Sequence, residues 1–311
     1  MTELKEYWRG GVEASDCDAM GHMSVGNWLR RYWDGVAVLA VELGMPTAFS
    51  ANAEVTLQLK SCHMHWLREA NAGTPIFMRG GILSLSETGL QFYGEFVKTI
   101  SEEVAANFCA QIILIDNKTS KTLPWPKKSL ENLDCPKIEI PKHGRPRSID
   151  ALSPIEKRDK NWVNNQGYVR IGLAPVTKND VDCHGRFLPQ LFIARVGEAI
   201  PNLIAKWRLE AIEETSENGA KQRLGGAALE NRTEVFEYPQ IGDIIEIYSA
   251  LREVADKTYS FQHWLINGQN GRPFSVSNVV VITFDLDTRK AITIPPKARQ
   301  YLESMVIKPQ H

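Results

Sequence analysis

The first candidate for chemistry is an acidic segment near the start of the chain, which carries Asp16, Asp18, Gly21 and His22. A carboxylate can act as a nucleophile or a general base, and a nearby imidazole can orient the substrate, a water molecule or that carboxylate. A stretch with helical periodicity follows at once. The first turn of a helix presents unpaired backbone N–H groups and the positive end of its dipole, which stabilise negative charge on an oxygen. The segment therefore places a base or nucleophile beside an anion-binding helix end.

Each of these residues also has a structural interpretation. Aspartates before a helix commonly cap it or form a turn, and a loop histidine such as His22 can simply bond to the backbone. Gly21 allows close approach of the backbone. Asn27, within the expected helix, either lines a pocket or is an exposed helix residue. We expect Asp16 to be structural, and these residues alone leave the role of Asp18 open.

The acidic pattern recurs in the second half of the chain. Asp180, Asp182 and Gly185 repeat the first segment at an offset of 164 (182 − 18). Arg186 stands where the first segment has its histidine, and His184 lies two positions earlier. The change indicates either a degenerate second site or an altered pocket.

Two further blocks match between the halves. The ends agree best: DNKTSKTLPWP (116–126) and DLDTRKAITIPP (285–296) share Asp, Thr, Lys, an aliphatic residue and Pro at an offset of 169 (285 − 116). Near the start, Tyr-x-Arg-x-Gly occurs at 7–11 and again at 168–172. Three blocks in the same order indicate a duplication, and a period this long gives two whole domains rather than a solenoid.

Each half has the same expected layout, namely a short strand, the acidic loop, one helix and then several strands. In the first helix, apolar residues recur at spacings of three and four, and Gly44-Met45-Pro46 ends it. Alternating or β-branched runs at 53–67, 74–87, 89–99 and 103–116 predict strands, as do 242–254, 257–266 and 274–287. One helix against about five antiparallel strands is an α+β domain, in which a curved sheet wraps the helix.

The sequence thus predicts a first domain at 1–126, a linker at 127–161 and a second domain at 162–311. The linker is rich in proline and shows little periodicity. Between 127 and 147 it holds six Lys or Arg residues against three acidic ones. We expect a solvated linker, and binding of a ligand's phosphate groups is the alternative.

Composition narrows the class of protein. The 311 residues are 43% apolar and carry a formal charge of −1, which argues against a chain-wide affinity for nucleic acid or membranes. Five cysteines without a CxxC pair favour a reducing compartment, and we expect a cytoplasmic protein. Cys62, His63 and His65 suggest a metal site, but strand alternation puts Cys62 opposite the histidines, so no metal is expected. No GxGxxG or P-loop pattern predicts a nucleotide cofactor.

The order of elements, with DCDAMGHM (16–23) at the helix entrance, resembles the hotdog-fold acyl-CoA thioesterases of the 4-hydroxybenzoyl-CoA thioesterase type. The family signature reads Asp-x-Asp-x-x-Gly-His-Val/Met-Asn, and Ser24 departs from its final Asn. The ends of both halves are also typical of the last strand in such domains. The resemblance implies two tandem hotdog domains, each a long helix wrapped by a curved antiparallel sheet, which form an intrachain pseudo-dimer.

The resemblance also implies hydrolysis of a CoA thioester without a cofactor. The family's second aspartate maps to Asp18, as nucleophile or base, with the helix end as oxyanion hole and His22 as an orienting group. Asp182 is the corresponding residue of the second loop. Related thioesterases that lack the loop aspartate can use a helix glutamate, which makes Glu198 a candidate; its alternative is an ion pair with Arg195. Substrate-binding candidates are Gly21, Asn27, Gly185 and Arg186.

Other functions remain open at this stage. The departures at Ser24 and Arg186 allow a catalytically silent acyl-CoA-binding protein, and acyl-ACP thioesterases also have a tandem arrangement. A hotdog dehydratase or hydratase is a third alternative, although its Asp-x-Asn-x-x-His entrance differs from this one. The expected partner is an acyl-CoA, with neither nucleic acid nor membrane, and two tandem chains can form a homodimer through an exposed sheet. Aromatic residues of the first helix, such as Trp28 and Tyr32, are expected in the core.

Overall fold

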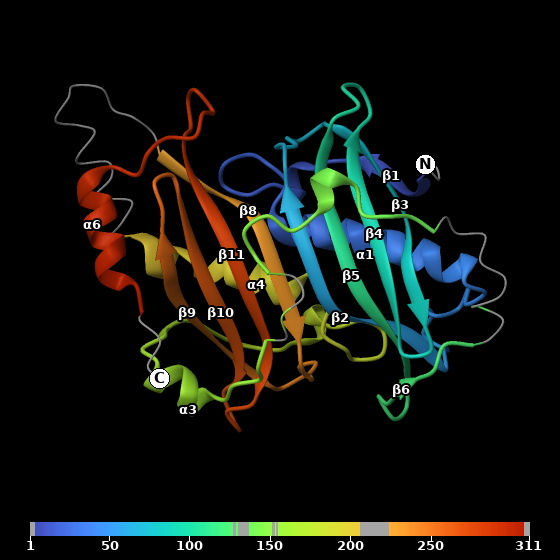
Figure 1. Cartoon of the computed structure of the whole chain (residues 1–311). Helices are drawn as coiled ribbons and strands as arrows, with labels where there is room; N and C mark the ends of the chain where they lie inside the picture. Colours follow the sequence, from blue (N-terminus) through green and yellow to red (C-terminus); the bar gives the residue numbers. More distant parts are fainter. Residues whose placement is uncertain are drawn as a thin grey trace. The chain divides into compact units, whose positions relative to one another are not determined.

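The chain consists of two compact units. A computed structural model describes residues 4–126, 129, 137–150, 153, 155–205 and 224–307. Unit 1 comprises Met1–Arg147 and Lys178–Ala194, and unit 2 comprises Ser148–Thr177 and Arg195–His311 (Figure 1). The second acidic loop therefore belongs to unit 1, although the repeat assigns it to the second half of the chain.

Unit 1 is an antiparallel sheet with one long helix. Its elements are β1 (Lys5–Gly11), the 3₁₀ turn η1 (Ala14–Asp16), α1 (Val25–Glu42), β2 (Val55–Trp66), β3 (Pro75–Ser86), β4 (Gly89–Lys98), β5 (Val104–Asp116), β6 (Thr122–Leu123) and the 3₁₀ turns η2 (Lys142–Gly144) and η3 (Lys178–Asp180). The strand order is β1-β3-β4-β5-β2, and β6 pairs with β5. The predicted strands at 53–67, 74–87, 89–99 and 103–116 correspond to β2 to β5, which confirms them.

Unit 2 has a second antiparallel sheet. Its elements are α3 (Lys160–Asn165), β7 (Val169–Pro175), β8 (Leu224–Val235), β9 (Ile244–Val254), β10 (Thr258–Asn267), β11 (Pro273–Asp285) and α6 (Pro296–Met305). The strand order is β8-β11-β10-β9-β7. The helix α4 (Leu191–Ala199) begins in unit 1 and ends in unit 2. Three elements were not predicted: β8, whose first residues are mostly small, the short helix α3 at the end of the expected linker, and the C-terminal helix α6.

Strands β2 to β5 and β8 to β11 have the same pairing register at a constant shift of 169. Gly80 faces Gly94 across β3 and β4, and Ser249 faces His263 across β9 and β10 (249 − 80 = 169). The same shift relates the pairs of β2 with β5 to those of β8 with β11. The expected duplication is thus visible in the hydrogen-bonded ladders.

The turn after the longest strand is repeated as well. The carboxylate of Asp116 accepts hydrogen bonds from the backbone of Lys118 and Thr119, and Asp285 accepts the corresponding bonds two and three residues on. Ser120 and Arg289, also 169 apart, have a positive φ of 56°. These turns explain the sequence match between 116–126 and 285–296.

Helix α1 packs its apolar stripe on one face of the sheet of unit 1. The hydroxyl of Ser24 caps the helix by accepting the N–H of Asn27, and Gly44 (φ 77°) follows its end, as predicted. The ring of Tyr32 stacks on Phe108 at 5.1 Å between centroids, and its hydroxyl donates to the carbonyl of Phe92 at 2.9 Å. The aromatic residues of this helix therefore belong to the core, as expected.

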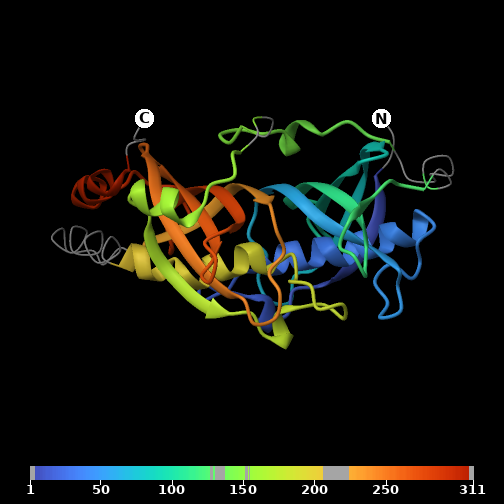
Figure 2. The same cartoon turned by 90° about the horizontal axis from the view of Figure 1, so that it is seen from below.

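Part of the predicted linker lies on the opposite face of this sheet. Figure 2 shows α1 on one side of the strands of unit 1 and the segment around η2 on the other. His143 of η2 places its Nε2 2.6 Å from the carboxylate of Glu95, a buried residue that also pairs with Arg79 and accepts the hydroxyl of Tyr93. The described part of the linker in unit 1 is thus fastened to the sheet, whereas Lys127 and its neighbours at 128 and 130–136 lie outside the described residues.

The sheet of unit 2 also carries helices on both faces. On one face, Trp264 packs with Val163 of α3 and with Tyr168. On the other face, Gly172 of β7 allows Ile247 of β9 and Ala199 of α4 to come close, because a Cβ there would lie 2.9 and 3.1 Å from their side chains. Among the described helices, none combines the length and the apolar character that a membrane span requires.

Candidate functional site

The first acidic loop is a tight turn closed by its own aspartate. The N–H of Asp18 donates to the carbonyl of His22 at 2.8 Å, and the N–H of Gly21 returns to the carbonyl of Asp18 at 3.0 Å. The carboxylate of Asp18 accepts the N–H of Met20 at 2.8 Å. Gly21 has a φ of 83°, a conformation that residues with a Cβ rarely adopt. The loop is therefore rigid, although the carboxylate of Asp18 remains 36% exposed.

His22 stands between two carboxylates. Its side chain is 9% exposed, with Nδ1 3.7 Å from Oδ1 of Asp18 and Nε2 3.3 Å from Oε1 of Glu69. The backbone of His22 also pairs with that of Asn71, which fixes the loop to the chain after β2. The structure thus brings together Asp18 and His22, the two residues of this loop expected to be catalytic, and adds Glu69. No pattern in the sequence indicated Glu69, because it lies 47 residues from His22 in a segment without periodicity.

Asp16 has a different environment from Asp18. It is 2% exposed, its carboxylate accepts the N–H of Glu13 at 3.2 Å, and it forms an ion pair with Arg31 at 3.1 Å. Partial burial acts to lower the pKa of Arg31, but the carboxylates of Asp16 and Asp34 outweigh it and raise that pKa above its ordinary value. These contacts agree with the expectation that Asp16 is structural.

The beginning of α1 is held by polar side chains and by a close helix contact. The amide of Asn27 donates to the carbonyl of Asp16 and to the hydroxyl of Ser24, both at 3.1 Å. Asn27 therefore holds the helix against η1. This is a structural role, whereas the prediction for Asn27 was a contact with substrate. A Cβ on Gly26 would lie 2.7 Å from the Cβ of Ala194, so glycine lets α4 approach the first turn of α1. This contact could not be predicted from the sequence either, because its two residues belong to different halves.

The second acidic loop repeats the fold of the first. The N–H of Asp182 donates to the carbonyl of Arg186 at 2.7 Å, and the N–H of Gly185 returns to Asp182 at 3.0 Å. The carboxylate of Asp182 accepts the N–H groups of His184 at 2.8 Å and of Arg186 at 3.0 Å. Gly185 has a φ of 76°. The offset of 164 therefore relates two turns that share three hydrogen bonds.

The side chains of the second loop bind other parts of unit 1. His184 places Nε2 2.9 Å from the carbonyl of Ser50, and Nη2 of Arg186 donates to the side-chain oxygen of Asn117. Arg186 is only 6% exposed. Arginine at this position thus joins the loop to the residue that follows β5.

Glu198 belongs to unit 2, whereas the second acidic loop belongs to unit 1. Its side chain is 63% exposed and pairs with Arg195 at 3.2 Å. In α1, Arg31 and Asp34 form the corresponding pair at 3.4 Å, at the same offset of 164. The ion pair that was the alternative for Glu198 is therefore present.

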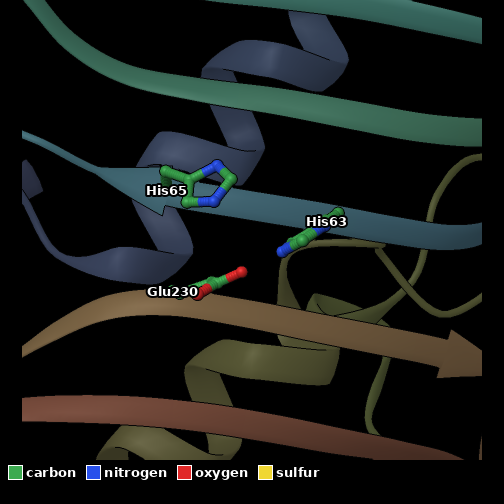
Figure 3. Close-up of side chains that lie close together, drawn as sticks. All are labelled: His63, His65 and Glu230. Atoms are coloured by element: carbon green, nitrogen blue, oxygen red, sulfur yellow. The ribbon is translucent and has the colours of Figure 1, made fainter. Parts of the chain in front are cut away.

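A hollow lies beside the segment that pairs with the first loop, and β2 carries a pair of histidines. The hollow has a volume of about 350 Å³. Lys98 and Ala72, the residue after Asn71, belong to its lining. Figure 3 shows His63 and His65 on β2. The centroids of their rings lie 4.8 Å apart. Cys62 lies in the core on the other face of β2, as the alternation predicts.

The third residue labelled in Figure 3 is Glu230 of β8. Within unit 2 it accepts the backbone N–H groups of Ser148 and Ile149 at 2.8 and 3.4 Å. Its buried carboxylate is therefore satisfied by backbone groups of the predicted linker at 127–161.

Comparison with known proteins decides the family. A sequence profile described as the thioesterase-like superfamily matches residues 12–133 and 176–302, one segment in each half. The chain belongs to the thioesterase-like superfamily. This membership confirms the resemblance seen in the acidic motifs and the expected enzyme class, a thioester hydrolase. The two matched segments, one in each half, agree with the tandem organisation. No curated protein sequence matches the chain significantly.

Solved structures of two thioesterases share the fold. The acyl-ACP thioesterase from Bacteroides thetaiotaomicron superposes with a TM-score of 0.63 at 13% identity and covers 89% of this thioesterase-like chain and 97% of its own. The 12:0-ACP thioesterase from Umbellularia californica gives a TM-score of 0.65 at 10% identity, with coverage of 89% and 93%. At such low identity the likeness establishes a hotdog-type fold with a large antiparallel sheet and few helices.

Proposed function

We propose that the protein hydrolyses the thioester of a small or medium acyl-CoA at the first acidic loop. The observation that carries the proposal is the pairing of the exposed Asp18 carboxylate with the shielded imidazole of His22, at the entrance of a capped helix. Asp18 acts either as the nucleophile on the thioester carbonyl or as the base that activates water. The N–H groups in the first turn of α1 stabilise the negative charge that develops on the carbonyl oxygen.

In this proposal His22 and Glu69 position the carboxylate of Asp18 or the water molecule that it activates. With Nε2 3.3 Å from Glu69 and Nδ1 3.7 Å from Asp18, the ring has one orientation relative to the loop. It can therefore position the attacking carboxylate or the water molecule next to it. The hollow that begins at Ala72 provides room for the thiol arm of the leaving group, and Lys98 supplies a positive charge for its phosphates. No cofactor takes part in this reaction scheme.

We assign a secondary role to the second copy. The turn of Asp182 and Gly185 keeps the geometry of the first loop, but Arg186 is used to hold Asn117. Asp182 and Glu198 thus stay candidates for a second site, with Gly185 and Arg186 as its binding residues. The domains at 1–126 and 162–311, their association into an intrachain pseudo-dimer with helices wrapped by the sheets, and a homodimer of such chains also stay predictions.

Two other functions on this fold need to be separated from the proposal. Acyl-ACP thioesterases have a similar fold, so the acyl carrier can be a protein instead of CoA. A silent acyl-CoA-binding protein would retain the loops without turnover. A panel of acyl-CoAs and the matching acyl-ACPs, assayed for released thiol with the full-length chain, distinguishes these cases. CoA thioesters that bind without any thiol release would refute the proposal.

The decisive variant is Asp18→Asn. Asparagine keeps the oxygen that accepts the N–H of Met20, so the turn is preserved while the charge and basicity are lost. We expect kcat to fall by at least about 10². The matched control is Asp182→Asn, which makes the same change in the second turn and should leave most of the activity. A near wild-type rate for Asp18→Asn would transfer the chemistry to Asp182 or Glu198.

A further inference from the structure

Unit 2 contains a cavity of about 530 Å³ whose described lining includes no residue of either acidic loop. The lining consists of the segment 148–150, of Ala255, and of residues from β9, β10 and β11. All of these residues belong to unit 2. Sites for small molecules usually measure about 300–1,000 Å³, so the cavity has room for one. The side chains that line it indicate which kind of molecule fits.

The segment 148–150 is fixed to the sheet of unit 2. The buried carboxylate of Glu230 accepts the N–H groups of Ser148 and Ile149. Arg232, which is also buried and also lies on β8, donates from Nη1 to the carbonyl of Asp150 at 2.5 Å. The cavity therefore has one wall whose backbone is held by buried side chains.

Among the described residues of the lining, Arg252 alone carries a positive charge. Arg252 is the extra residue of a β-bulge in β9, since its neighbours Leu251 and Glu253 pair with consecutive residues of β10. Bulges turn side chains out of the regular alternation and often occur beside functional sites. Unit 1 has the same bulge at the shift of 169, but its extra residue is Leu83. The cation is thus specific to unit 2.

Arg252 is half-buried, and no described carboxylate forms an ion pair with it. Six other arginines of unit 2 each pair with a glutamate, namely Arg158, Arg170, Arg195, Arg232, Arg272 and Arg299. The charge of Arg252 acts instead on Tyr168, because burial raises the pKa of this phenol and Arg252 opposes the rise. A guanidinium matches the oxygens of a carboxylate or a phosphate. The unpaired charge of Arg252 in a cavity therefore indicates an anionic ligand.

Neutral hydrogen-bonding groups also line the cavity. The hydroxyls of Ser148, Thr258 and Ser260 have no hydrogen-bond partner among the described residues. Asn278, also in the lining, accepts the amide of Gln262 at 2.8 Å with its side-chain oxygen, which leaves its own amide N–H groups as donors. A carboxylate has two oxygens, whereas a phosphate presents three acceptor oxygens. The number of donors therefore favours a phosphate group.

Two carboxylates belong to the same lining, those of Asp150 and Glu253. The carboxylate of Asp150 accepts the N–H of Ser153 at 3.2 Å and also its hydroxyl. Glu253 is exposed, so solvent and salt screen its charge. Carboxylates accept hydrogen bonds from sugar hydroxyls, as in dinucleotide sites, and Ile149 and Val280 offer apolar contacts. The lining therefore suits a molecule with one phosphate and several hydroxyl groups.

We propose that the cavity of unit 2 binds a phosphorylated sugar, either free or as part of a nucleotide. The phosphate binds the guanidinium of Arg252 and the hydroxyls of the lining, and the sugar hydroxyls bind Asp150 and Glu253. This site differs from the hollow at Lys98, which belongs to unit 1. The proposal does not depend on thioester hydrolysis, because no group of the first acidic loop takes part.

Isothermal titration calorimetry on the full-length chain tests the proposal with ribose 5-phosphate, AMP, ribose and inorganic phosphate. We expect at least one of the two phosphorylated sugars to bind about tenfold or more tightly than ribose and inorganic phosphate, because only these sugars engage both kinds of group. Tighter binding of AMP than of ribose 5-phosphate identifies a nucleotide as the ligand. Tighter or equal binding of ribose 5-phosphate identifies the free sugar phosphate.

Variants locate the bound ligand. Arg252→Gln should weaken the binding of the better ligand by about tenfold or more, since it removes a charge-assisted contact. Ser260→Gln, which introduces the residue that unit 1 has at this position, Gln91, should also weaken it by occupying part of the cavity. The matched controls are Arg272→Gln, in an exposed arginine of unit 2 outside the lining, and Lys98→Gln in unit 1. Both should leave Kd unchanged.

Several results would refute the proposal. These are the absence of binding of both phosphorylated sugars at millimolar concentration, binding of inorganic phosphate as tight as theirs, or an unchanged Kd in Arg252→Gln. A loss of binding in Lys98→Gln but not in Arg252→Gln would assign the ligand to unit 1 and refute it as well. Thermal unfolding of each variant shows whether its fold is intact. If Arg252→Gln is destabilised, Ser260→Gln decides, because it leaves the charge of Arg252 in place.

Discussion

Replacement of Asp16 by alanine should destabilise unit 1 without removing the chemistry of the first loop. The carboxylate of Asp16 is buried and forms an ion pair with Arg31, whose side chain is only 18% exposed. Removal of one partner from a buried pair typically costs about 3–5 kcal/mol. The cost is lower here because Arg31 keeps Asp34 at 3.4 Å. We therefore expect the free energy of unfolding to fall by about 2–3 kcal/mol.

Thermal and urea unfolding of the full chain measure this loss. For a unit of this size about 1 kcal/mol lowers Tm by roughly 2–4 °C, so the midpoint of unit 1 should fall by roughly 5–10 °C. Asp34→Ala is the control, because it removes an exposed partner of Arg31 and should cost about 0.5 kcal/mol or less. Asp16→Ala should keep kcat within about twofold when assayed well below its midpoint. Equal destabilisation by both variants would refute the role of burial, and a hundredfold loss of kcat at an unchanged midpoint would make Asp16 catalytic.

Three further predictions concern the core and the thiols. Gly80→Ala should destabilise unit 1 by about 3 kcal/mol or more, because the new Cβ would lie 2.2 Å from the backbone oxygen of Tyr93; urea unfolding that matches the wild type would contradict this. His263 has a pKa of about 3 when folded and 6.5 as its ordinary value, so the unfolded chain binds more protons between these limits. The contribution of His263 to stability should accordingly be full above pH 6.5 and fall by up to about 1.4 kcal/mol per unit as the pH drops toward 3, so the dependence of stability on pH should be shallower by this amount in a His263→Gln variant. Burial raises the pKa of Cys109 to about 11, so a thiol reagent should label the exposed Cys183 quickly in the native protein and Cys109 only after unfolding, as mass mapping would reveal.

Much of the fold could be predicted because the relevant signals are local. Alternating apolar residues located β2 to β5 and β9 to β11, and helical spacing with Gly44 at the end located α1. β8 was missed because its sequence begins LGGAAL, which lacks the β-branched residues typical of strands. Its place in the sheet depends on pairing with β11 rather than on its own propensity.

The candidate site was predicted only in part, for a related reason. Asp18 and His22 form a motif within five residues, so their proximity follows from the sequence. Glu69 and the Gly26–Ala194 contact result from tertiary packing over 47 and 168 residues, and no local pattern encodes them. The hydrogen bond of Arg186 could not be predicted either, because its partner Asn117 has the sequence context of an ordinary turn residue.

The division of the chain into units has a consequence for its synthesis. The polypeptide enters unit 2 after Arg147, returns to unit 1 for Lys178–Ala194 and then leaves it again. A ribosome that has completed residue 147 must therefore add 47 more residues (194 − 147) before unit 1 possesses all its parts. At roughly 5–20 residues per second this delay lasts about 2–10 s. During that interval the groups that bind the second loop, such as Asn117 and the carbonyl of Ser50, lack their partners in the nascent domain. The two units must therefore complete their folding together and not in succession.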